Sequence, residues 1–154
     1  TPSVGPGLVR RGLGRVRFAI HMDAGHPLVA PRPRVTLQAW LVYPQVIVET
    51  GHGGSSLVAA TLARAGIERR IGLVVPGFLA ALAALRGTEL TYAAPRELTA
   101  PLLETFGLCA VVPPIDLPEV PVAALWHERF THDPAHRFFR ELVRREFEQV
   151  ISTH

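Results

Sequence analysis

The segment Gly51-His52-Gly53-Gly54-Ser55-Ser56 is the part of the chain whose residue types and spacing most suggest chemistry. It follows the β-branched run 45–49 and precedes an apolar helical run, so it lies at the start of an expected helix. Free N–H groups and the helix dipole attract anions there, and a ligand carboxylate could bind. A glycine-permitted tight turn, with Ser55 or Ser56 as a plain helix cap, explains the same residues. Both interpretations stay open.

Two catalytic motifs similar to this segment are incomplete. No Gly-Lys-Ser/Thr sequence follows, as a phosphate-binding P-loop requires, and the G-x-G-x-x-G order of dinucleotide sites is missing. The His-Gly-Gly order resembles a lipase-type oxyanion loop, but the chain has no G-x-S-x-G nucleophile elbow. Asp116, Glu119 and Glu128 show no paired arrangement suited to acid–base catalysis. We therefore expect no enzymatic activity.

Three histidines and one cysteine are candidate metal ligands or nucleophiles. His127 and His132 fall in a predicted loop before His136, and no Cys or Glu stands at a recognised zinc spacing. Cys109 lies inside the apolar run 108–112, which favours a buried thiol acting as a small hydrophobic group. We expect neither a metal nor another cofactor.

Phe78 is a candidate ligand contact because of its place after a strand. It directly follows Val75-Pro76-Gly77, and open α/β sheets bind ligands outside the carboxyl ends of their strands. An ordinary aromatic residue of the core is the other interpretation of Phe78.

Composition narrows the class of protein. The 154 residues are 48% hydrophobic and 19% charged, which suffices for a hydrophobic core of one domain. The net charge is +3, and all 16 basic residues are Arg and are spread out, so this segment gives little support for nucleic-acid binding. The densest run, 137–145, alternates with Glu and indicates a solvated helix face. Without a membrane span or a signal-peptide pattern we expect a cytoplasmic protein, although the chain opens at Thr1 rather than Met.

Strand and helix patterns alternate along most of the chain. Residues 1–15 look like an irregular lead-in, rich in Gly and Pro. The alternation predicts an α/β domain with a mostly parallel sheet and helices on both faces. The expected strands are 16–22, 45–49, 70–75, 90–93, 108–112 and 122–126, and the expected helices are 57–65, 78–85 and 96–106, with a shorter helical turn from Thr36 to Leu41.

The last element is predicted to be a long helix that begins at Asp133-Pro134. Asp133 can cap its free N–H groups, and Pro134 fits the first helical position. One apolar stripe at helical spacing indicates that the helix packs against another element. The stripe consists of Ala135, Phe138, Phe139, Leu142, Val143, Phe147 and Val150.

Several motifs, in order, resemble the effector-binding domain of LysR-type transcriptional regulators. They are Gly25-His26-Pro27-Leu28, the step Val75-Pro76-Gly77-Phe78-Leu79-Ala80, then Trp126-His127-Glu128-Arg129, and 133–142. The Trp-His ending is particularly similar to the subgroup of nodulation and aromatic-degradation regulators. The resemblance covers about residues 16–147.

The resemblance implies a type-2 periplasmic-binding-protein-like fold of two α/β lobes with an effector in the cleft between them. It implies one complete distal lobe at 28–118 and a partial proximal lobe from 1–27 and 119–154, with the winged helix-turn-helix absent from this chain. A small aromatic or carboxylate inducer, a homo-oligomer (dimer or tetramer) and DNA binding only through that missing N-terminal domain are expected. An extracytoplasmic solute-binding protein of the same fold is the alternative. Matched residue by residue, the implied effector contacts are Gly53, Gly54, Ser55, Ser56, Phe78 and Ala124.

Overall fold

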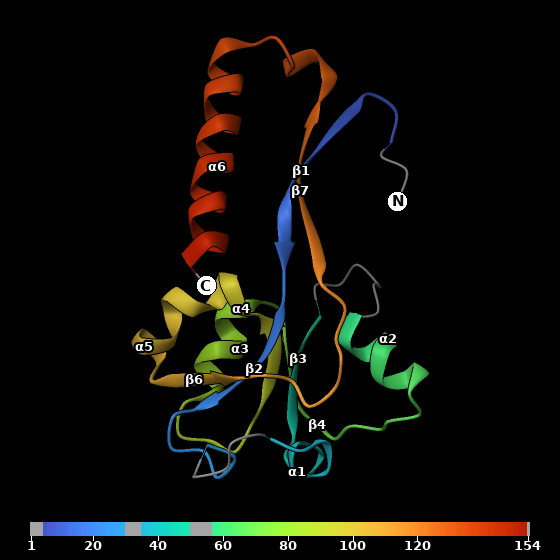
Figure 1. Ribbon diagram of the computed structural model, residues 1–154, viewed down its shortest axis with the longest axis vertical. Coiled ribbons are helices and arrows are strands. Elements are labelled where there is room, and N and C mark those ends of the chain that lie inside the picture. The colour runs from blue at the N-terminus through green and yellow to red at the C-terminus, as the bar shows by residue number, and fades with distance from the viewer. Residues whose placement is uncertain (1–4, 30–34, 50–56, 154) are drawn as a thin grey trace. The chain divides into compact units, whose positions relative to one another are not determined.

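The computed structural model describes residues 5–29, 35–49 and 57–153, which form two compact units (Figure 1). Unit 1 takes its described residues from 1–16 and 119–154, and unit 2 spans Arg17–Pro118. Residues 17–27 therefore belong to unit 2, whereas the family resemblance implied that they form one lobe with residues 119–154. The reason is a strand in this stretch that pairs only with strands of unit 2.

Unit 1 is a two-stranded antiparallel sheet with one long helix. β1 (Leu8–Val16) pairs with β7 (Val120–His127), and the register shifts between Gly12 and Gly14. The expectation of an irregular lead-in at 1–15 is wrong, because β1 acquires its partner from the far end of the chain. A short 3-10 helix, η2 (Glu128–Phe130), leads from β7 toward the last helix.

The last helix, α6 (Pro134–Thr153), begins as predicted and packs along β1 (Figure 1). Asp133 Oδ1 accepts a hydrogen bond from the His136 N–H at 2.7 Å. The predicted apolar stripe is only partly correct, since Phe138 and Phe139 are 71% and 60% exposed. Among the described residues, no helix combines the length and apolar character that crossing a bilayer requires.

Unit 2 contains five described strands, one of which runs against the others. β2 (Phe18–Asp23) is antiparallel to both β5 (Tyr92–Pro95) and β6 (Leu108–Val111). β3 (Gln45–Val48) is parallel to β4 (Ile71–Val75) and bridges in parallel to Thr91. β3, β4, β5 and β6 thus share one direction, and β3 with β4 is the parallel strand pair among the described residues of unit 2. The antiparallel β2 is the exception that the alternating pattern did not predict.

Three helices of unit 2 match the sequence closely. α1 (Leu37–Val42) is capped by Thr36, whose Oγ1 accepts from the Ala39 N–H at 3.2 Å. α2 (Leu57–Arg64) ends before Gly66 and α3 (Phe78–Leu85) before Gly87. Both glycines adopt a left-handed conformation, with φ of 66° and 67°, that favours glycine at a helix end.

The predicted helix 96–106 is broken into three short pieces. They are α4 (Arg96–Thr99), the 3-10 turn η1 (Ala100–Leu102) and α5 (Leu103–Phe106). Pro101 explains the break, because it has no N–H to donate to the carbonyl of the preceding helical turn. The prediction of one continuous helix is therefore wrong, and Pro101 is the sequence signal for the break.

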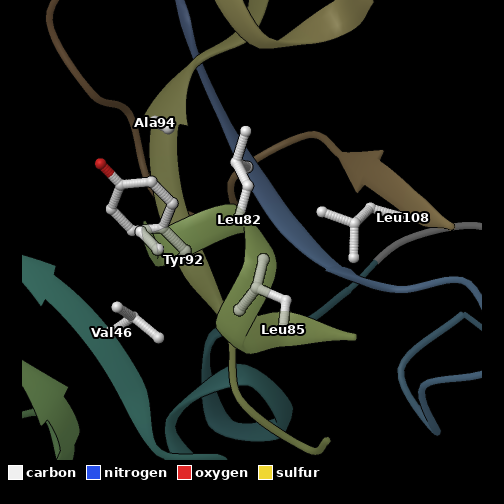
Figure 2. Packing of buried hydrophobic residues seen from close by; sticks show 7 residues of the cluster. Val46, Leu82, Leu85, Tyr92, Ala94 and Leu108 are labelled. Carbon is white, nitrogen blue, oxygen red and sulfur yellow. The ribbon is translucent and has the colours of Figure 1, made fainter. Parts of the chain in front are cut away.

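Two apolar clusters cover opposite faces of the sheet. Tyr92 and Ala94 of β5 belong to a cluster with α3, whereas Ala93 packs on a cluster that includes Trp40 of α1 and Leu62 of α2. The expectation of helices on both faces is confirmed. Figure 2 shows the α3 cluster, which consists of Val46, Ala81, Leu82, Leu85, Tyr92, Ala94 and Leu108.

Candidate functional site

The carboxyl ends of β3 and β4 lie at the same edge of the sheet because these strands are parallel. Val48 pairs with Val75, and the Glu49 N–H donates to the Val75 carbonyl at 3.0 Å. The turn Pro76-Gly77 and the start of α3 follow directly. This edge is where open α/β sheets bind ligands.

Phe78 lies at this edge and is 52% exposed. It is the first residue of α3 and is not a member of either buried cluster. Its ring centroid lies 6.4 Å from that of Tyr92, with the planes tilted by 56°. The structure therefore favours the surface interpretation of Phe78 over the interpretation as a core aromatic residue.

The N-terminus of α3, beside Phe78, has no side-chain cap among the described residues. Gly77 is the cap residue, and no side chain makes the capping hydrogen bond. A Cβ built on Gly77 would meet no described atom within 4 Å. The first backbone N–H groups of a helix have no partner within the helix, so they can bind an acceptor from outside it. Those N–H groups and the helix dipole favour an oxygen acceptor or an anion.

Tyr92 is a residue of this site that the sequence did not single out. The residue is only 5% exposed, and its ring packs between α3 and β3 (Figure 2). Burial raises the pKa of its hydroxyl, which keeps the proton on the oxygen. The sequence showed only a tyrosine in an expected strand, and its nearness to Phe78 depends on tertiary structure.

His21 holds the backbone of Tyr92 from the neighbouring strand. Its Nδ1 lies 3.2 Å from the Tyr92 carbonyl oxygen, which can only accept, so Nδ1 carries the proton. Its Nε2 then accepts from the Thr99 hydroxyl at 2.6 Å. Burial lowers the pKa of His21, although hydrogen bonds with the backbone of Tyr92 and Ala19 oppose this effect. A neutral His21 thus links β2, β5 and α4.

The other predicted contacts lie outside the described residues or in unit 1. Gly53, Gly54, Ser55 and Ser56 lie outside the described residues. Ala124 is a partly buried residue of β7 in unit 1, where it pairs with Arg11.

The histidines near the C-terminus have local structural contacts. His127 Nδ1 accepts from the Arg129 N–H at 3.3 Å. His136 stacks on Phe130 with ring centroids 5.2 Å apart, and its Nδ1 lies 2.7 Å from an Arg140 nitrogen. Within the described ranges no three His, Cys, Asp or Glu residues are grouped to hold a metal ion.

Cys109 packs against the α1–α2 cluster and is partly buried. Burial raises the pKa of its thiol, and the nearby Asp23 carboxylate adds to this effect. A thiol with a raised pKa is a poor nucleophile at neutral pH, consistent with a packing role.

Comparisons with known proteins agree on one family. The model of the LysR substrate binding domain matches residues 1–148. The HTH-type transcriptional activator NagR of Ralstonia sp. is 31% identical over 142 residues, which cover 92% of this chain and 46% of NagR. The chain thus spans about half the length of such relatives.

Solved structures show the same fold. The regulatory domain of MexT, a transcriptional activator in Pseudomonas aeruginosa, superposes with a TM-score of 0.76 at 23% sequence identity. The matched region covers 94% of this chain and 70% of the MexT chain. The effector binding domain of QuiR, solved in complex with shikimate, superposes with a TM-score of 0.72 at 15% sequence identity. The matched region covers 97% of this chain and 69% of the QuiR chain.

Proposed function

We propose a function on the premise that this chain belongs to the LysR substrate binding domain family, whose model matches residues 1–148. The family match confirms the family that the sequence motifs indicated. The superposition on the MexT regulatory domain confirms the expected periplasmic-binding-protein-like fold. The proposal is that the chain is the effector-sensing domain of a bacterial transcription regulator. Its ligand is a small aromatic compound or carboxylate.

One observation carries the choice of ligand: the half-exposed Phe78 ring stands next to the uncapped N-terminus of α3. An exposed ring offers apolar area for stacking, and the helix N-terminus offers donors for an oxygen acceptor. Shikimate, the molecule bound by QuiR, is itself a ring that carries a carboxylate. Gly53, Gly54, Ser55, Ser56 and Ala124 remain proposed effector contacts.

The proposed mechanism involves no covalent chemistry. A ligand that binds one arrangement of the two units more tightly than another shifts the population toward that arrangement. The coupling to DNA binding equals this difference in affinity and is reciprocal. We further propose that the intact regulator is a homo-oligomer in the cytoplasm and binds DNA through a separate winged helix-turn-helix domain.

An extracytoplasmic solute-binding protein of the same fold is the competing function. The relatives named above are transcriptional regulators and support the sensor instead. The coding sequence upstream of Thr1 distinguishes the two, because a regulator encodes a helix-turn-helix there and a solute-binding protein encodes a signal peptide.

The ligand proposal is tested by calorimetric titration of the full chain with benzoate, salicylate and shikimate. We expect wild-type protein to bind at least one of them, and Phe78→Ala to weaken that binding about tenfold or more through lost ring contact. Leu79→Ala is the matched control, because Leu79 is the next residue and is 61% exposed. A folded wild-type chain that binds none of the three, or equal affinities for both variants, contradicts the proposal.

A further inference from the structure

Gln45 carries a buried hydrogen-bond donor that has no partner in the described part of the chain. Gln45 is the first residue of β3 and is only 1% exposed. Its Nε2 atom is closed off from solvent and makes no hydrogen bond with a described residue. Its Oε1 atom accepts from Arg69 Nη1 at 3.4 Å. Turning the amide over would place two donors against each other, so the unpaired group is the NH₂ and requires an acceptor.

Arg69 brings a positive charge to the same place. It is partly buried, and it forms no ion pair with a carboxylate of the described residues. Burial lowers the pKa of Arg69, because the charged form loses contact with water. The guanidinium still keeps its proton, and its single contact with Gln45 leaves other N–H donors for a guest. A buried cation is normally paired, so Arg69 favours an anion as the missing acceptor.

We infer that Gln45 and Arg69 bind a small monovalent anion, of which chloride is the simplest, between the Gln45 Nε2 atom and the Arg69 guanidinium. One negative charge balances the one positive charge, whereas a divalent anion would leave a net charge in the interior. A hydrogen bond to an ion is also stronger than one between neutral groups, which compensates for the loss of water around the anion.

The anion enters past the side chain of Arg69. The backbone around Gln45 is fixed, since the Gln45 N–H donates to the Arg70 carbonyl and the Val46 N–H to the Thr91 carbonyl, each at 2.8 Å. Arg69 precedes β4, and its long side chain remains partly exposed. Rotation of this side chain therefore opens a path from solvent to Nε2 while the strands stay in place.

The anion site is distinct from the proposed effector contacts at the carboxyl edge of the sheet. Gln45 and Arg69 lie at the amino ends of β3 and β4, on the side of α1 (Figure 1). Phe78 follows the carboxyl end of β4 instead. The inference is therefore independent of the proposed function, and either can fail without the other.

Thermal unfolding of the full chain in sodium chloride and in sodium gluconate, at equal ionic strength, tests the site. Gluconate is too large to reach Gln45 and serves as the salt control. We expect chloride to raise the wild-type midpoint above that in gluconate by about 2–4 °C, with saturation as the concentration rises. Equal midpoints in the two salts refute the site.

Arg69→Gln should abolish the difference between the two salts. Arg70→Gln is the matched control, because it removes the same charge from the next residue, which is exposed, and it should keep the difference. Gln45→Met replaces the amide with an apolar side chain of similar length. This variant should also lose the chloride effect, while its midpoint in gluconate is no lower than that of wild type. A chloride effect that survives in Arg69→Gln or Gln45→Met contradicts the inference.

Crystals of the wild-type chain grown in sodium bromide test the same site directly. We expect an anomalous bromide peak within hydrogen-bond distance of Gln45 Nε2, because bromide has the same charge as chloride and a similar size. An ordered water at that position, or no density there, overturns the inference.

Discussion

The Nε2 atom of His21 lies 2.6 Å from the hydroxyl oxygen of Thr99, and both residues are buried. The same histidine donates from Nδ1 to the Tyr92 carbonyl, and burial lowers its pKa, so the neutral form is favoured at neutral pH. A buried neutral histidine at the centre of unit 2 makes the stability of this unit depend on pH.

We expect acid to destabilise unit 2 through His21. Its folded pKa lies below 6.5, mainly because burial disfavours the charged form. The unfolded chain therefore binds a proton that the folded chain resists, and stability is full above about pH 6.5 and falls as the pH drops below it. The loss is up to about 1.4 kcal/mol per pH unit until the folded pKa is reached. Urea unfolding at pH 7.5, 6.5 and 5.5 measures it, and His21→Gln should flatten the profile; an unchanged slope contradicts the assignment.

Glu97→Gln should destabilise the start of unit 2. The side chain of Glu97 is 3% exposed and accepts from the Arg17 N–H at 2.8 Å and from Arg17 Nε at 3.0 Å. Burial alone would raise the pKa of Glu97, but these hydrogen bonds outweigh it and leave the pKa lowered. Since charge-assisted bonds are lost, we expect about 1–2 kcal/mol less unfolding free energy in urea at pH 7. Glu104→Gln, an exposed residue of α5, should change little.

Gly72→Ala should be costly for a steric reason. A Cβ at this position of β4 would lie 2.7 Å from Pro44 Cβ and 2.8 Å from Leu90 Cδ2, and the proline ring cannot move aside easily. Overpacking of this kind costs about 1–3 kcal/mol. Gly12→Ala in β1 is the control, because a Cβ there meets no described atom within 4 Å. Equal thermal midpoints for the two variants would show that β4 adjusts without cost.

Arg140→Lys should loosen the connection between β7 and α6 although the charge is kept. The Arg140 guanidinium lies 4.5 Å from the Trp126 ring centroid and donates to the carbonyls of Phe130 at 3.0 Å and Thr131 at 2.9 Å. A lysine ammonium cannot reproduce the planar stack and the fork of donors, so about 1–2 kcal/mol is lost. Circular dichroism during thermal unfolding, with exposed Arg137→Lys as the control, tests this expectation.

Local signals made much of the fold predictable. The cap at Thr36, the glycines after α2 and α3, and the Asp133-Pro134 start of α6 are each set by residues close in sequence. The structure confirms α3 with both predicted ends.

Features that depend on contacts between residues far apart in sequence could not be predicted from local sequence patterns. β1 is a strand because residues of β7 pair with it, and its own Gly and Arg content gives little sign of this. The antiparallel pairing of β2 and the meeting of Tyr92 with Phe78 are equally non-local. Gly53, Gly54, Ser55 and Ser56, singled out for their glycines and hydroxyls, lie outside the described residues, so their role stays a prediction.

The pairing of Leu8 with His127 has a consequence for how the chain folds. Unit 2 is one continuous stretch, so a ribosome can release all of it before the partner of β1 has been made. Unit 1 must join two segments of the chain separated by the whole of unit 2. Closing so long a loop costs conformational entropy, and folding that depends on such distant contacts is slow. Unit 2 should therefore fold first and bring the ends of unit 1 within reach, and chains arrested before residue 119 should leave β1 without its partner strand.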